Sequence, residues 1–382
     1  MNNRIFLCLA HMSGNEKKYI QEAFETNWVV PLGPNVCEFE ASLERYIHPD
    51  SRSKVVALSS GTAAIHLALV ALGIGRGDEV MVQNLTFCAS ANPVLYQGAT
   101  PVFVDSETDT WNMDPQLLDE AIAERIRVTG RTPKAIIPVT LYGMPYKIDR
   151  ILEVADKYGI PVVEDSAEGL GSRFKGQMMG TFGTFGVMSF NGNKMITTSG
   201  GGALICNPSG ETPVEEMKER VKYFATQARQ PLPYYHHTEI GYNYRMSNIC
   251  AGIGRGQMTV LDDHIAHHKR LHRLYADLLA DVEGVAVKHA PSQEYDSNYW
   301  LTTITLERCN PERLRVKLDE AGIESRPLWK PMHQQPVYKS YPAYVNGVSD
   351  ALFATGLCLP SGPLVTEEDV SRIVDVIKNA IQ

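Results

Sequence analysis

The chain has 382 residues and a formal net charge of −8, and hydrophobic residues make up 44% of it against 21% charged residues. This length suffices for two or three domains and a large buried core. The acidic balance argues against a surface for nucleic acid or anionic membranes, and no stretch approaches the length of a transmembrane helix.

Two further features concern the compartment. The apolar run from Ile5 to Ala10 is too short for the core of a signal peptide, and no small-residue cleavage pattern follows it. The seven cysteines are scattered and never form a CxxC pair. Cysteines used in this way are typical of small buried side chains in a reducing compartment, so we expect a cytoplasmic protein.

The first predicted elements are helices. Ser13 followed by Glu16 is a capping-box pattern, which predicts a helix reaching about Thr26. A break rich in proline and glycine follows, and residues 36–46 predict a second helix. Trp28, which lies in the break, suits either the core or the wall of a substrate site, and the sequence alone favours the core.

A turn of small residues comes next. Residues 54–59 predict a strand, and the sequence SSGTAA then leads directly into an apolar helix. The N-terminus of such a helix offers free N–H donors and the positive end of the helix dipole, which suits a phosphate at Gly61, Thr62 and Ala63. A plain strand-to-helix turn is the favoured explanation of this hexapeptide when it is taken alone.

Short apolar runs then alternate with helical patterns. Strands are predicted at residues 79–83, 100–105, 135–141 and 160–164, and a helix is predicted at residues 148–158. This alternation indicates a parallel sheet that is covered by helices on both faces. Because ligands of such sheets bind beyond the carboxyl ends of the strands, residues at these ends are candidates for a site.

Three candidates follow these strands. The ring of Phe87 is suited to stacking on a planar cofactor, although packing in the core is the default for an aromatic side chain. Asp165 and Glu168, in the sequence EDSAEG, follow the strand at 160–164. A carboxylate there can pair with a pyridinium nitrogen, whereas a helix-capping role explains Asp165 almost as well.

A lysine occupies an unusual position between an apolar strand and a glycine-rich loop. The strand ends at Ser189 and Phe190, a turn follows, and Lys194 precedes the loop TTSGGG. Partial burial would favour the neutral amine that a Schiff-base nucleophile requires. The alternative is an exposed loop lysine, which this stretch alone favours.

The chain changes character after this loop. The sequence GYNYRMS contains Asn243 and Arg245, and residues 248–281 predict one long helix or a kinked pair. That helix carries histidines at helical spacing, namely His264, His267, His268 and His272. Because lysines and arginines are interleaved with them, the pattern favours a solvated polar face over a metal site.

The last part of the chain predicts a smaller α+β domain. A strand is predicted at residues 299–306, a helix at 311–321 and a strand at 323–326. We expect a large domain over residues 1–248 and a small domain over residues 249–382. The basic and aromatic stretch RPLWKPMH suits an anionic or ring-bearing ligand, and its candidates are Arg326, Trp329 and His333.

Taken together, these motifs resemble the fold-type-I pyridoxal phosphate (PLP) enzymes, specifically the DegT/DnrJ sugar-nucleotide aminotransferase family. The ordered set SSGTAA, TF, EDSAEG, SFNGNK and GYNYRMS carries the resemblance, which extends along nearly the whole chain. It implies an α/β fold with a mostly parallel sheet and a small C-terminal domain. Thr140 is a departure, because many relatives carry histidine there.

The resemblance also implies a role for each matching position. Lys194 would form the Schiff base with PLP and move protons, and Asp165 would pair with the pyridinium nitrogen. Gly61, Thr62, Ala63 and Ser189 would hold the phosphate, Phe87 would stack on the ring, and Glu168 would lie near the phenolic oxygen. Asn243 would reach the phosphate of a neighbouring subunit, which implies a homodimer, and the role of Arg245 is less defined.

Within the family, the closest resemblance is to the bacillosamine-type enzymes, which aminate the 4-keto group of a UDP-linked 2-acetamido-trideoxyhexose with glutamate as donor. Trp28, Arg245, Arg326, Trp329 and His333 would then contact the sugar nucleotide. Perosamine-type and legionaminic-type substrates fit the same chemistry. The rivals are a sugar dehydratase, which would carry histidine in place of Lys194, a cysteine desulfurase, and a non-catalytic regulator that keeps the fold.

Overall fold

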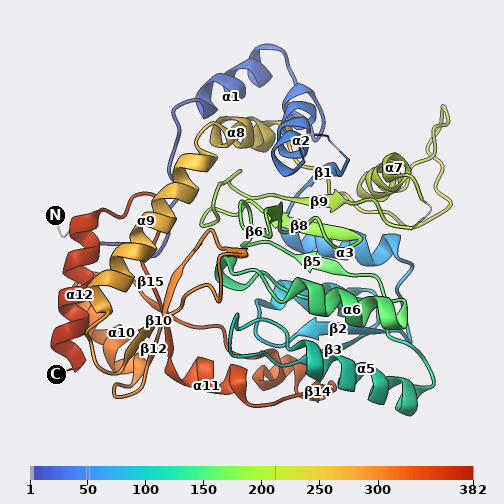
Figure 1. Ribbon diagram of the computed structural model, residues 1–382. Helices are drawn as coiled ribbons and strands as arrows, with labels where there is room; N and C mark the ends of the chain where they lie inside the picture. The colour runs from blue at the N-terminus through green and yellow to red at the C-terminus, as the bar shows by residue number, and fades with distance from the viewer. Residues whose placement is uncertain (1–3, 49, 51, 211, 382) are drawn as a thin grey trace.

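The computed structural model describes residues 4–48, 50, 52–210 and 212–381. Its largest element is a central sheet, whose strands run across the middle of Figure 1 one above another. Two four-stranded ladders form this sheet, and parallel bridges from Ile136 to Val162 and from Val139 to Asp165 join them. In spatial order the strands are β14 (Ala343–Tyr344), β3 (Thr100–Val104), β2 (Glu79–Gln83), β4 (Ala135–Ile137), β5 (Val163–Asp165), β8 (Phe185–Ser189), β9 (Gly202–Cys206) and β1 (Lys54–Leu58).

The direction of the strands confirms the predicted α/β class. Apart from β9, which runs antiparallel to both of its neighbours, the paired strands of this sheet are parallel. Helices cover both faces, so successive side chains of one strand enter different cores. In β2, Val80 and Val82 pack in a cluster with α3 and α7, whereas Met81 packs in a cluster with α5 and α6. This burial on both faces explains why the strands read as continuous apolar runs.

The covering helices include two that the sequence predicted, the helix that follows SSGTAA and the helix at residues 148–158. On the two faces of the sheet lie α3 (Gly61–Ala71), α4 (Asn92–Tyr96), α5 (Pro115–Thr129), α6 (Ile148–Tyr158) and α7 (Val214–Ala225). The N-terminal pair is α1 (Glu16–Glu25) and α2 (Pro34–Ile47). Helix α1 begins at Glu16 rather than at Ser13, because Gly14 has a φ of 93°. The Glu16 carboxylate nevertheless accepts the Ser13 N–H at 2.7 Å, as a capping box requires.

A second, antiparallel sheet lies to one side. Its strands are, in order, β10 (Val285–Val287), β12 (Thr302–Leu306), β15 (Gly356–Leu359) and β13 (Arg326–Pro327). It is covered by α9 (Leu261–Leu279), α10 (Pro311–Glu320) and α12 (Glu367–Ile381). The predicted strand at 323–326 is confined to Arg326 and Pro327, because Ile323 instead pairs with Ile5. The remaining elements are α8 (Asn248–Met258), α11 (Val348–Thr355), β6 (Arg173–Phe174), β7 (Gln177–Met178) and β11 (Tyr295–Asp296).

The two parts of the chain exchange segments. Ile5 belongs to the N-terminal part but donates its N–H to the carbonyl of Gly322 at 2.9 Å. Conversely, β14 comes from the C-terminal part but extends the large sheet beside β3. Helix α8 packs on α1 and α2, as Figure 1 shows. The domain boundary at 248/249, which falls after the first residue of α8, stays a prediction.

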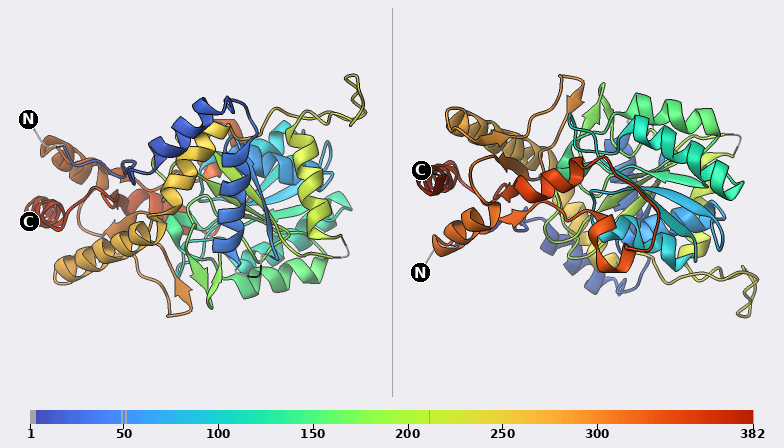
Figure 2. Two further views of the ribbon diagram at one scale, coloured as in Figure 1. Left: turned by 90° about the horizontal axis from the view of Figure 1, so that it is seen from above. Right: turned by 90° about the horizontal axis from the view of Figure 1, so that it is seen from below.

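The segment after α7 extends away from the body of the molecule, as both views of Figure 2 show. Residues 231–240 within it are exposed, and they include Tyr234, Tyr235 and Ile240. None of the described helices is both long and apolar enough to cross a membrane.

The long predicted helix is a kinked pair, α8 and α9, and its histidines require a correction. The prediction of a solvated polar face is wrong for His264, His268 and His272, whose side chains are buried. This face of α9 packs against residues near the start of β12 and against the loop after β8. His264 contacts the carbonyl oxygen of Met195 at 3.0 Å, and His272 stacks on the ring of Tyr299.

Candidate functional site

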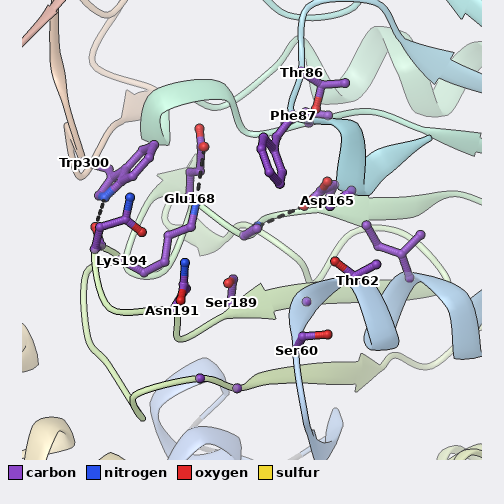
Figure 3. Close-up of a pocket in the computed structure, with 18 of the residues that line it drawn as sticks. Ser60, Thr62, Thr86, Phe87, Asp165, Glu168, Ser189, Asn191, Lys194 and Trp300 are labelled. Carbon is purple, nitrogen blue, oxygen red and sulfur yellow. Dashed lines mark hydrogen bonds and ion pairs between the residues drawn. The ribbon is translucent and has the colours of Figure 1, made fainter. Parts of the chain in front are cut away.

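A cavity of about 260 Å³ lies at the carboxyl ends of β4, β5 and β8, and Trp300 and Trp329 from the C-terminal part of the chain also line it. It brings together most of the residues that the motifs singled out. Its lining residues are Ser59, Ser60, Gly61, Thr62, Ile65, Thr86, Phe87, Ala89, Val139, Leu141, Asp165, Ala167, Glu168, Ser189, Asn191, Asn193, Lys194, Gly200, Gly201, Trp300 and Trp329. Figure 3 shows Lys194, Glu168 and Trp300 on one side of this cavity and the start of α3 on the other.

Asp165 is the last residue of β5 and is buried below the cavity floor. Its carboxylate accepts the hydroxyl of Ser90 at 2.6 Å and the N–H of Ala167 at 3.2 Å. Burial raises the pKa of Asp165 above its usual range, while these hydrogen bonds and the positive charge of Lys194 oppose the rise. A buried carboxyl group with so few partners is suited to a positively charged ligand atom.

Lys194 lies in the connection between β8 and β9. A turn closed by its own N–H and the carbonyl of Asn191, at 3.0 Å, directs the side chain into the cavity. Its Nζ lies 3.3 Å from Oε1 of Glu168. The other carboxylate oxygen of Glu168 accepts the N–H of Tyr142 at 2.7 Å, so both oxygens are held. Burial raises the pKa of Glu168, and the charge of Lys194 counteracts part of this effect.

The N-terminus of α3 forms the opposite wall. The Ser60 hydroxyl caps the helix by accepting the N–H of Ala63 at 3.0 Å. The N–H groups of Gly61 and Thr62 precede the first intrahelical bonds, so they are available to an anion. Gly202 must be glycine, because a Cβ there would lie 2.4 Å from the nitrogen of Gly61. Strand β9 therefore supports this helix start through backbone contact.

Aromatic rings line the entrance. Phe87 and Trp329 have ring centroids 5.4 Å apart, and Tyr142 lies between Trp329 and Trp300 with its ring nearly parallel to both. The Phe87 ring is 53% exposed, so it is not a core side chain. The indole N–H of Trp329 is buried and has no partner in the described part of the chain. An unpaired buried donor beside a cavity is suited to an oxygen atom of a ligand.

Other predicted site residues do not line this cavity. Arg245 pairs with Glu40 at 2.7 Å and also donates to the carbonyl of Ala57. His333 pairs with Asp350 at 3.3 Å.

Three more predicted residues also lie outside it. Arg326 is exposed and pairs with Glu324 at 2.9 Å, the side chain of Asn243 is exposed, and Trp28 is 39% exposed. The roles predicted for these residues stay predictions.

The motifs missed Ser90, Tyr142 and Trp300. Ser90 and Tyr142 follow predicted strands, so the rule that ligands bind at carboxyl ends could have included them. Trp300 precedes β12 of the small domain and reaches the cavity only through the packing of the two parts. No local pattern in the sequence signals such a residue.

Comparisons with known proteins agree with this geometry. The model of the DegT/DnrJ/EryC1/StrS aminotransferase family matches residues 11–378. The Bacillus subtilis protein named "Putative pyridoxal phosphate-dependent aminotransferase EpsN" is 46% identical, over 99% of this chain and 96% of the relative. The GDP-perosamine synthase of Caulobacter vibrioides is 36% identical, over 99% of this chain and 98% of the relative.

A solved structure is also similar. The PLP-form of "Putative sugar aminotransferase Spr1654" from Streptococcus pneumoniae is 28% identical, with a TM-score of 0.91, over 99% of this chain and 98% of that chain.

The residues of the cavity suit PLP independently of the comparisons. It combines an amine, a buried carboxyl group suited to a positively charged ring nitrogen, and a helix N-terminus suited to a phosphate. The chain belongs to the DegT/DnrJ/EryC1/StrS family and is a PLP-dependent sugar-nucleotide aminotransferase.

Proposed function

We propose that the protein transfers the amino group of glutamate to the 4-keto carbon of a UDP-linked 2-acetamido-trideoxyhexose. The observation that carries the reaction type is the meeting of Lys194, Asp165 and the start of α3 at one cavity. These are the groups needed to move a proton, to bind a pyridinium and to bind a phosphate. We name the bacillosamine-type sugar because the motifs around Lys194 and Trp329 most resemble those enzymes.

We infer the roles of the cavity residues, and of Ala63 beside them, from the family resemblance. In this proposal Asp165 pairs with the ring nitrogen, Gly61, Thr62, Ala63 and Ser189 hold the phosphate, and Phe87 covers the ring. Glu168 lies near the phenolic oxygen. PLP, when bound, supplies an electron sink for the carbon that loses its proton.

Lys194 carries the proton in both directions. Its Nζ takes the proton from the α-carbon of glutamate and later gives a proton to the sugar carbon that receives the nitrogen. Glu168, at 3.3 Å, fixes the position of Nζ between these steps. Because both oxygens of Glu168 are engaged, this carboxylate acts as an anchor rather than as a second base.

The sugar nucleotide is proposed to enter along the aromatic rings. The unpaired N–H of Trp329 offers a donor to a sugar or acetamido oxygen, and the ring faces suit an apolar methyl group. Trp28, Arg245, Arg326 and His333 remain candidates for further contacts. They lie outside this cavity, and contacts from them require either the nucleotide end of the substrate or a second subunit.

A second candidate substrate is a GDP-linked perosamine-type keto-sugar. Relatives named GDP-perosamine synthase, from Caulobacter vibrioides and Escherichia coli O157:H7, are 36% and 37% identical to this chain. The same 4-keto chemistry serves both sugars, so the difference lies in recognition of the base and the acetamido group.

The two candidates are separated by spectroscopy of the purified holoenzyme. Glutamate should remove the visible absorbance of the bound cofactor, and the UDP-linked 4-keto-6-deoxy-2-acetamido sugar should restore it. Restoration by the GDP-linked 4-keto-6-deoxy sugar alone would discard the UDP substrate and keep the aminotransferase. In the control, Lys194→Ala should bind PLP without turnover, and steady-state amination by this variant would contradict the role of the lysine.

We also propose a homodimer with shared sites, in which Asn243 reaches the phosphate of the neighbouring subunit. The exposed side chain of Asn243 and the projecting segment at residues 231–240 support this proposal. Light scattering of the purified protein gives its mass. A dimer in which Asn243→Ala weakens PLP binding is the expected result, and a monomer of full activity would refute it.

A further inference from the structure

Trp300 is carried by the small domain but lies beside the catalytic lysine of the large domain. It precedes β12, and its side chain is only 2% exposed. Figure 3 shows the indole next to the Lys194 side chain, on the side of the cavity away from α3. Neither the motif analysis nor the roles proposed above assign this residue a part in the reaction.

The side chain makes two different contacts with the lysine loop. Its edge donates the indole N–H to the carbonyl oxygen of Asn193 at 2.6 Å. Its face lies under the lysine, with Nζ of Lys194 at 4.1 Å from the ring centroid. One side chain thus binds the backbone before Lys194 and the amine of Lys194 itself.

The backbone around Trp300 is tied to the other partner of the lysine. The N–H of Trp300 is donated to Oδ1 of Asn298 at 2.8 Å, and Nδ2 of Asn298 donates to the carbonyl oxygens of Glu168 and Leu170, both at 2.9 Å. Asn298 is fully buried. Trp300 and Glu168 are therefore held in one hydrogen-bonded frame, and both contact Nζ of Lys194.

These contacts restrict the position of the Lys194 side chain. A lysine that is not covalently bound has a flexible four-carbon stem, and fixing it in one position costs rotamer entropy. An aromatic face attracts an ammonium group within about 6 Å of its centroid and has no such attraction for a neutral amine. A ring on one side and a carboxylate on the other therefore favour a single position of the protonated side chain.

We propose that Trp300 is a positioning residue that holds the free Lys194 side chain, as the ammonium, between its ring face and Glu168. This position of Nζ matters in the half of the cycle in which Lys194 is not bonded to the cofactor and must deliver its proton to the sugar carbon. This inference rests on the proposed role of Lys194 as the proton carrier.

The test separates the ring face from the N–H donor. Trp300→Phe keeps a face and loses the donor, whereas Trp300→Leu loses both. Trp111→Leu is the matched control, because Trp111 is also buried and also carries a lysine, Lys288, at 4.8 Å from its ring, but lies outside the cavity. If Trp300→Leu does not fold, Trp300→Met also lacks a ring face and offers a longer, more adaptable side chain to the vacated space.

The first measurement uses the cofactor-free protein. Competitive labelling of amines, read by mass spectrometry, gives the reactivity of Lys194 relative to the other lysines. We expect Trp300→Leu to raise the labelling of Lys194 on the order of fivefold, and Trp300→Phe to stay within about twofold of the wild type. Equal labelling in Trp300→Leu, Trp111→Leu and the wild type would overturn the proposal.

The second measurement uses the holoenzyme. We expect Trp300→Leu to lower kcat about tenfold with little change in the KM for the sugar nucleotide. We expect Trp300→Phe to retain most of the wild-type kcat. A fall in kcat as large in Trp300→Phe as in Trp300→Leu would refute the role of the ring face, and so would a change in KM without a change in kcat. If the wild type aminates no keto-sugar, the proposed function fails. The labelling experiment would still show whether the ring of Trp300 holds the Lys194 side chain in place.

Discussion

Replacing His272 by phenylalanine should remove a destabilising effect of acid on the folded protein. His272 lies on α9 with its ring stacked on Tyr299 at a centroid distance of 3.6 Å. Both of its ring nitrogens are buried, and neither has a hydrogen-bond partner among the described residues. Phenylalanine keeps the stacked ring and removes the nitrogens, so the change isolates the titration of this side chain.

The magnitude follows from the pKa of His272. Burial, assisted by the charges of His289 and Arg273, lowers this pKa from 6.5 to about 3. The unfolded chain therefore binds a proton below pH 6.5 that the folded chain does not bind until about pH 3. The stability that the neutral ring contributes is complete above pH 6.5 and is lost as the pH falls. At pH 5 the loss is about 2 kcal/mol, at 1.36 kcal/mol per pH unit.

The assay is urea unfolding at pH 8, 7, 6 and 5, at constant ionic strength, followed by circular dichroism and tryptophan fluorescence. Other buried groups titrate in both proteins, so the quantity to compare is the difference in unfolding free energy between variant and wild type. This difference should grow in favour of His272→Phe by about 2 kcal/mol between pH 8 and pH 5. A difference that is constant with pH would refute the reasoning. The same substitution at the exposed His236 is the control.

Three further changes test the site and its support. Asp165→Asn should lower kcat about a hundredfold and weaken PLP binding, as measured by steady-state kinetics and cofactor titration, and unchanged kcat would remove its proposed pairing. Gly202→Ala should displace the backbone at Gly61, where its Cβ would lie 2.4 Å from the nitrogen, and weaken PLP binding about tenfold; a crystal structure with α3 unmoved would contradict this. Glu40→Ala should remove the charge partner of the largely buried Arg245 side chain and cost about 3 kcal/mol of stability, which a melting curve equal to the wild type would refute.

The parts of the fold that the sequence predicted are those with a local physical cause. The strands around Val80 and Val163 read as apolar runs because helices cover both faces of the sheet. Ser60 caps α3, and a turn precedes Lys194. The hydrogen bonds of both motifs join residues that are close in the sequence, so a short stretch suffices to predict them. The family resemblance then supplied the roles and the cofactor, which the motifs taken singly left open.

The features that the sequence did not predict depend on contacts between distant segments. The burial of His268 and His272 arises where α9 meets the residues before β12, and interleaved basic residues concealed it. Trp300 contacts Lys194 although more than a hundred residues separate them in the sequence. Arg245 was a candidate for substrate binding, but its pairing with Glu40 becomes visible only when α2 packs on β1.

The pairing of Ile5 with Ile323 has a consequence for the biosynthesis of the chain. Ile5 exchanges backbone hydrogen bonds with Gly322 and Glu324, at 2.9 and 2.8 Å. During translation, residues 322–324 leave the ribosome long after Ile5 does. Until then this apolar segment is unpaired, and closing so long a loop costs chain entropy. Apart from β14, the strands of the central sheet can pair while translation continues, whereas the pairing of Ile5 with Ile323 forms only near the end of translation.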